Sequence, residues 1–69
     1  MKILALDQAS NVSGWAIFQD GKLDSYGKID LHSITNVYER LHELKLQVKT
    51  LIQENQIEKV FLEDIYMDG

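Results

Sequence analysis

The chain has 69 residues, of which 45% are hydrophobic and 26% charged, with a formal net charge of −4 and neither cysteine nor proline. A chain of this size forms one domain at most, and without cysteine it has no disulfide framework and no cysteine zinc site. The acidic balance argues against a generally basic surface for nucleic acids. Since no apolar run approaches the ~20 residues of a membrane span or resembles a signal peptide, a cytoplasmic protein is predicted.

Two strands are predicted at the start of the chain. The continuous apolar run over 3–6 suits a strand buried on both faces, as in a parallel sheet covered by helices. Asp7 ends this run, and the polar residues 8–11 predict a turn. The β-branched and aromatic residues of 12–18 then predict the second strand.

A hairpin should join the second strand to a third. Asp20-Gly21 is a strong hairpin signal, and the third strand is expected over 22–29. Polar and apolar residues mix there, which suits a strand nearer the edge of the sheet. Simple alternation would place Leu23 on the same face as Ile29.

A long amphipathic helix is predicted over 34–54, about 30 Å at 1.5 Å per residue. Ser33 or Asn36 is expected to cap its start, and Asn36 with Glu39 has the spacing of a capping box. Asn55 is the expected left-handed terminator. The apolar stripe that should face the sheet consists of Val37, Leu41, Leu44, Val48 and Leu51.

A last strand is predicted over 60–62, ending at Glu63. A strand, a long helix and a strand make a crossover unit, which places its two strands parallel and is right-handed in nearly all cases. The expected fold class is therefore α/β. Ligands of such sheets gather at the carboxyl ends of the strands.

Two carboxylates occupy matching places in this unit. Asp7 follows the first apolar run and Glu63 follows the last, so parallel neighbouring strands would bring them to about 5 Å of each other at the strand spacing. A divalent cation relieves the repulsion between such groups, and hard oxygen ligands suit Mg²⁺ or Mn²⁺. The alternative is that Asp7 and Glu63 are ordinary acidic residues at the places where their strands end in solvent. Asp64 is either an outer partner of this site or a surface charge.

Other side chains give weaker indications. His32 and His42 have no cysteine or second close histidine beside them, and no nucleophile elbow, P-loop or dinucleotide fingerprint is present. Trp15 is expected to pack in the core or on the sheet face. Tyr66 should lie beside the carboxylates, either as a hydrophobic plug or as a platform on which a base could stack.

The segment ILALDQASNVSGWAIF resembles the opening of RuvC-type Holliday-junction resolvases, in the ribonuclease H-like superfamily. In that family an apolar strand and an Asp are followed by Pro-Gly-Ser and, a few residues later, by Thr-Gly-aromatic. Asp7, Ser10 and Gly14-Trp15 fall in register with this pattern, and Gly27 matches a glycine of the third strand.

The segment VFLEDIYM resembles a second family pattern, in which an apolar strand is followed by Glu, two residues and an aromatic residue. Glu63 and Tyr66 match its Glu and its aromatic residue. The order and spacing of the two segments also agree with the family, so the resemblance spans nearly the whole chain.

This resemblance implies a three-stranded antiparallel meander, a long helix and a fourth strand parallel to the first. It also implies metal-dependent endonuclease activity on branched DNA, the four-way junction of recombination and repair. Two divalent ions, Mg²⁺ or Mn²⁺, would be held by four acidic residues and activate a water. Asp7 would lie between the two metals and Glu63 would hold one, while Ser10 and Tyr66 would contact DNA. Symmetric cutting implies a homodimer.

The sequence also departs from the family. Gln8-Ala9 replaces Pro-Gly, which suggests a divergent, phage-type member. The family's other two acidic residues come from a later helix, so residues 1–69 are expected to be the N-terminal part of a single nuclease domain, inactive by itself. Two alternatives stay open: a segment of the actin-like ATPase and sugar-kinase superfamily, and a non-catalytic ribonuclease H-like interaction module.

Overall fold

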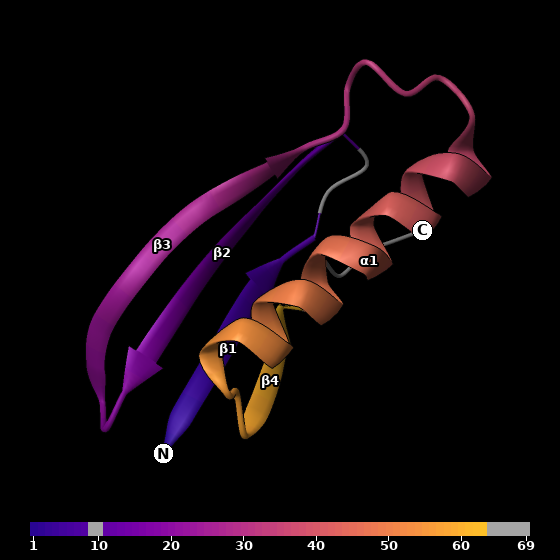
Figure 1. The fold of residues 1–69 in the computed structure, drawn as a ribbon. Helices are drawn as coiled ribbons and strands as arrows, with labels where there is room; N and C mark the ends of the chain where they lie inside the picture. The colour runs from indigo at the N-terminus through magenta and orange to yellow at the C-terminus, as the bar shows by residue number, and fades with distance from the viewer. Residues whose placement is uncertain (9–10, 64–69) are drawn as a thin grey trace.

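The computed structural model describes residues 1–8 and 11–63, with Glu63 placed by its backbone. Four strands and one helix make up this part of the chain (Figure 1). In chain order they are β1 (Lys2–Asp7), β2 (Val12–Gln19), β3 (Lys22–Asp30), α1 (Val37–Asn55) and β4 (Lys59–Glu63).

The four strands form one mixed sheet in the order β3-β2-β1-β4. Strand β2 pairs antiparallel with both β1 and β3, whereas β4 pairs parallel with β1. The helix lies across one face of this sheet (Figure 1). The predicted α/β arrangement of a meander, a long helix and a parallel fourth strand is therefore confirmed.

The β2–β3 hairpin turns at the predicted Asp20-Gly21 pair. Both residues have positive φ, 52° and 83°, as the two-residue turn that matches the twist of antiparallel strands requires. Beyond the turn a bulge interrupts the register, because Ile17 pairs with Ser25 but Phe18 pairs with Leu23. Because of the bulge, Leu23 does not follow the alternation of the rest of β3, and its side chain is 55% exposed. The simple alternation predicted for this strand was therefore wrong at Leu23.

Helix α1 begins three residues later than predicted and ends one residue later. Asn36 is its N-cap, and its side chain accepts hydrogen bonds from the backbone N–H groups of Tyr38 and Glu39 at 2.9 and 3.1 Å. The left-handed residue is Gln56, with φ 53°, rather than the predicted Asn55. Asn55 stays helical, and its side-chain amide donates to the carbonyl of Leu51.

The core lies between α1 and one face of the sheet. Ile29, Leu31 and Leu44 form its buried cluster, and the half-buried side chains packed around it include Trp15, as predicted. The expectation that β1 is buried on both faces was wrong for the described residues. Leu4 and Leu6 are buried on the side of α1, whereas the alternating residues are only half-buried, because the opposite face has no described element over it.

The predicted apolar stripe is only partly covered. Val37 and Leu41, in the first turns of the helix, are 55% and 57% exposed. Helix α1 has 19 residues, about 28 Å, whereas β4 has 5, about 17 Å. The helix is therefore longer than β4, the strand that follows it. Within the described part of the chain, no helix is long and apolar enough to cross a membrane.

Candidate functional site

The two predicted carboxylate positions lie side by side at one end of the sheet. Asp7 is the last residue of β1, Glu63 is the last residue of β4, and the parallel register pairs them directly. Paired residues on neighbouring strands have backbones about 4.8 Å apart. Alternation along β1 puts Asp7 on the face away from α1, because Leu4 and Leu6 are buried against the helix. The Asp7 side chain is exposed.

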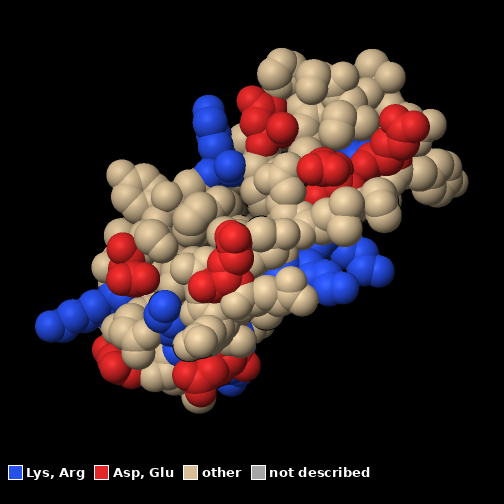
Figure 2. All heavy atoms as spheres, in the orientation of Figure 1, with Lys and Arg blue, Asp and Glu red and all other residues tan. Residues whose placement is uncertain are grey.

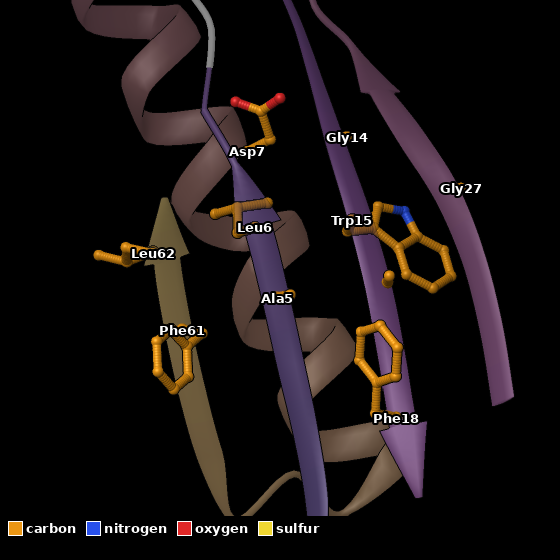
Figure 3. A pocket seen from close by; sticks show the side chains of 10 residues that line it. Ala5, Leu6, Asp7, Gly14, Trp15, Phe18, Gly27, Phe61 and Leu62 are labelled. Carbon is orange, nitrogen blue, oxygen red and sulfur yellow. The ribbon is translucent and has the colours of Figure 1, made fainter. Parts of the chain in front are cut away.

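The surroundings of Asp7 leave room for a ligand. Its partner on β2 is Gly14, where even an added Cβ would meet no atom within 4 Å. Asp7 stands at the end of an open hollow of about 680 Å³ on the uncovered side of the sheet, whose other side chains are mainly apolar and include Phe18 and Phe61 (Figure 3). A solvent-accessible carboxylate beside a position without a side chain can take an oxygen-seeking cation.

A second polar group lies at the same end of the sheet. Asp30 ends β3, which runs parallel to β1, and its carboxylate pairs with the His32 ring at 2.6 Å. The His32 ring and backbone N–H both hydrogen-bond this carboxylate, and the charge of Lys28 adds to their effect, so the pKa of Asp30 lies below its ordinary value of 3.8. His32 is therefore the hydrogen-bond partner of Asp30.

Asn11, which directly precedes β2, is tied to the start of α1. The Arg40 guanidinium donates from Nη1 to Oδ1 of Asn11 at 2.6 Å, and the Leu31 backbone N–H donates to the Asn11 carbonyl, also at 2.6 Å. Neither Arg40 nor Asn11 belongs to the set predicted from sequence. The sequence signal that could have drawn attention to Arg40 was its position in the first turn of a predicted helix, where acidic residues are favoured.

Several predicted site residues lie outside the described residues. These are Ser10, Asp64 and Tyr66, together with the side chain of Glu63. Within the part that is described, no group of three or more histidine, aspartate and glutamate side chains is placed to hold a metal ion. The structure thus brings the Asp7 and Glu63 positions together, and their roles stay predictions.

Charged side chains of both signs lie on the face of the molecule seen in Figure 2. On the face seen in Figure 2, acidic and basic side chains alternate, and no single sign covers the surface. The whole chain carries 7 basic and 11 acidic residues. A large basic patch, the usual electrostatic footprint of a nucleic-acid-binding domain, is not seen on this face.

The fold is similar to part of larger solved proteins. A crystal structure of the Ppx/GppA family member of Aquifex aeolicus matches with a TM-score of 0.58 and 24% identity. A second structure of the Aquifex aeolicus PPX-GPPA enzyme matches with a TM-score of 0.56 and 27% identity. In both cases the match covers 90% of this chain and 25% of the solved one. The likeness is one of fold.

No protein-family model matches the sequence. Among curated proteins, the crossover junction endodeoxyribonuclease RuvC of Magnetococcus marinus is 28% identical over 71 aligned positions. The match covers 97% of this chain and 39% of that protein, so the chain spans about two fifths of its relative's length. The resemblance expected from the motifs at Asp7 and Glu63 is confirmed: over nearly its whole length, this chain is similar to a RuvC-type resolvase.

Proposed function

We propose that this chain is part of a metal-dependent endonuclease for branched DNA, with Asp7 and Glu63 as ligands of Mg²⁺ or Mn²⁺. The observation that carries the proposal is the direct pairing of these two positions at the carboxyl ends of parallel strands. The similarity to a crossover junction endodeoxyribonuclease supports it independently. Residues 1–69 would belong to a single ribonuclease H-like nuclease domain.

The donor set fits a hard divalent cation. Asp7 offers exposed carboxylate oxygens, Glu63 would supply a second carboxylate, and Mg²⁺ binds one or two carboxylates together with water and phosphate. When bound, such ions activate a water for in-line attack on a phosphodiester and neutralise the charge on the leaving oxygen. The protein's own part is to hold two carboxylates at a fixed spacing on rigid strands.

DNA would approach from the end of the sheet where β1 and β4 finish. Ser10, in the turn after Asp7, and Tyr66, three residues after Glu63, are the proposed DNA contacts. An aromatic ring there could stack on an unpaired base at a branch point. The whole protein would act as a homodimer, since two symmetric cuts need two sites. With two of four expected ligands, residues 1–69 alone would not cut.

A second candidate function is a segment of an actin-like ATPase or sugar-kinase fold, favoured by the likeness to the Ppx/GppA structures. In that case the hairpin after Asp7 would hold a nucleotide phosphate. Gln8-Ala9 supplies fewer small and hydroxyl residues than a phosphate-binding turn normally has. A non-catalytic ribonuclease H-like module would instead bind neither metal nor nucleotide.

Equilibrium binding distinguishes these functions. A fluorescently labelled four-way junction and a linear duplex of the same length are titrated with the protein, with and without Mg²⁺, and ATP is titrated separately. The nuclease proposal predicts a metal-dependent preference for the junction and no ATP binding. Metal-dependent ATP binding without junction preference would contradict it, and so would a lack of binding to all three ligands.

A further inference from the structure

Strand β3 forms one edge of the sheet and carries exposed side chains. The strand order β3-β2-β1-β4 leaves one side of β3 without a neighbouring strand in the described part of the chain (Figure 1). An edge strand presents a row of unpaired backbone N–H and C=O groups, to which a further strand can add. Tyr26, at the middle of this edge, is 75% exposed, and tyrosine is enriched where proteins bind one another. This edge can therefore accept another strand, and its side chains decide which one.

The charges on β3 alternate in sign along the strand. Lys22, Asp24, Lys28 and Asp30 are all exposed, and together they leave the strand neutral, although the chain has a net charge of −4. Proteins commonly protect a sheet edge with charged side chains, which keep two copies apart when like charges meet across the new strand pair. A neutral strand with alternating signs lacks this protection against its own copy.

The order of the charges matches itself when the strand is reversed about Tyr26. In an antiparallel pair of two copies centred there, Asp24 stands opposite Lys28 of the second copy, and the two Tyr26 residues face each other. Opposite charges and aromatic rings at facing positions stabilise neighbouring strands. Tyr26 pairs with Ala16 and Lys28 with Gly14, which places both on the uncovered face of the sheet. The bulge leaves Asp24 without a partner on β2.

The charge pattern also specifies this register. Tyr26 is the midpoint of β3, so an antiparallel pair centred on it uses the whole strand. Moving the centre one residue towards the end of β3 would set Asp24 against Asp30 of the second copy. Moving it one residue towards the hairpin would set Lys22 against Lys28. Facing like charges destabilise a strand pair, so both shifts are unfavourable.

We propose that β3 pairs with β3 of a second copy of this chain, antiparallel and centred on Tyr26, to form a symmetric homodimer. A two-fold axis perpendicular to the sheet passes between the two Tyr26 residues, so the same surface serves both copies, as a closed dimer requires. The two sheets join into one continuous sheet with both helices on the same face. This pairing needs neither metal nor DNA, so it does not depend on the proposed nuclease function.

The dimer would also set the spacing of the two candidate metal sites. Asp7, Gly14 and Lys28 lie level with one another on neighbouring strands, two residues along from Tyr26. At the usual strand and residue spacings, the two Asp7 positions are roughly 25–30 Å apart on the same face of the joined sheet. This consequence alone rests on the proposed function, in which Asp7 holds a metal ion.

Disulfide formation between single-cysteine variants tests the register, because the chain has no cysteine of its own. Disulfides join residues whose Cα atoms are about 4.4–6.8 Å apart, and facing residues of antiparallel strands are about 4.5–5.5 Å apart. Tyr26→Cys, oxidised mildly without metal or DNA, should therefore run as a dimer in non-reducing gel electrophoresis. Lys28→Cys alone should not, because its two copies lie about 14 Å apart in this register. An equal mixture of Lys28→Cys and Asp24→Cys should form the mixed dimer.

Charge reversal tests the interface without cysteine. Asp24→Lys sets two lysines against each other and Lys28→Glu sets two acids against each other, so each should weaken the dimer about tenfold in sedimentation equilibrium. The double variant restores opposite charges and should recover to within about threefold of the parent. Lys49→Glu is the matched control, an equal change at an exposed position of α1, and should alter the dimer affinity by less than about twofold. Thermal unfolding confirms that each variant is folded.

Several outcomes would overturn the proposal. A parent chain that stays monomeric up to about 1 mM would do so, and so would cross-linking of Lys28→Cys as rapid as that of Tyr26→Cys. A double charge variant that dimerises no better than Asp24→Lys would also contradict the register. Loss of the metal-dependent junction preference would instead refute the proposed function and leave this interface standing.

Discussion

Replacing Gly27 with alanine should destabilise the protein, because a methyl group at this position has no room beside Trp15. A Cβ on Gly27 would lie 2.6 Å from Cζ2 and 2.8 Å from Cε2 of the indole. Carbon atoms in contact are about 3.5–4.0 Å apart, so the ring must move by about 1 Å. Trp15 packs against the buried cluster of Ile29, Leu31 and Leu44, which resists that movement.

The magnitude follows from two opposing terms. Overpacking of this kind costs about 1–3 kcal/mol, and replacing glycine by alanine in a strand returns about 0.5–1 kcal/mol. The free energy of unfolding should therefore fall by about 1 kcal/mol, and by no more than about 2.5 kcal/mol, and each kcal/mol lowers the melting temperature by roughly 4–8 °C for a domain of this size. Gly14→Ala is the matched control, since an added Cβ there meets nothing within 4 Å, and its melting temperature should not fall.

Thermal unfolding followed by circular dichroism gives the melting temperatures of both variants. The fluorescence emission of Trp15, the single tryptophan, reports on the surroundings of the indole ring. In a Trp15→Phe background the cost of Gly27→Ala should shrink to less than half, because the two residues are partners in one contact. The steric account would be refuted if Gly27→Ala melted at or above the parent temperature. It would also be refuted if Gly14→Ala lost as much stability as Gly27→Ala.

Further predictions concern the ends of α1 and the acidic group on β3. Asn36→Ala should lower the free energy of unfolding by about 1 kcal/mol, because two backbone N–H groups lose their acceptor. Urea unfolding measures this loss, and the control variant Asn36→Asp should be as stable as the parent. Gln56→Gly should raise the free energy of unfolding by up to about 1 kcal/mol, because glycine adopts φ 53° without strain. Asn55→Gly, one residue earlier and helical, should lower the free energy of unfolding. A stabilising Asn55→Gly together with a destabilising Gln56→Gly would contradict the observed helix end. His32→Ala should raise the pKa of Asp30 towards 3.8 by removing its main hydrogen-bond partner. Since the folded-state pKa is depressed, ionised Asp30 stabilises the fold above its unfolded pKa, and this contribution is lost as the pH falls through the folded pKa. This prediction would be refuted if a carboxyl-carbon NMR titration gave the same Asp30 pKa in the parent and in His32→Ala.

The directions of the strands could be predicted because the rules behind them are local or topological. The Asp20-Gly21 turn determines the hairpin, and the length of the helical segment determines a parallel crossover. These two rules place Asp7 and Glu63 at the same end of the sheet, whereas the placement of the fourth strand beside the first was implied by the resemblance to the resolvase family. The direct pairing of these two positions is a result of the structure.

Other features depend on tertiary contacts that no local pattern encodes. The bulge that shifts Leu23 depends on how β2 and β3 match in length, and the half-open face of β1 depends on which elements cover the sheet. Likewise, the contact between Arg40 and Asn11 joins the start of α1 to the residue before β2, 29 positions apart in the sequence. Sequence patterns treat these two residues separately, as a surface cation and a turn residue.

The central claim is that Asp7 and Glu63 hold a divalent cation, and Mn²⁺ titration followed by backbone NMR tests it most directly. The parent is compared with Asp7→Asn and with Asp30→Asn, which removes a carboxylate at the same end of the sheet. Bound Mn²⁺ should broaden the amide signals around residues 7 and 63 in the parent and in Asp30→Asn, and Asp7→Asn should bind at least tenfold more weakly. Equal Mn²⁺ affinity in Asp7→Asn and the parent would contradict the claim.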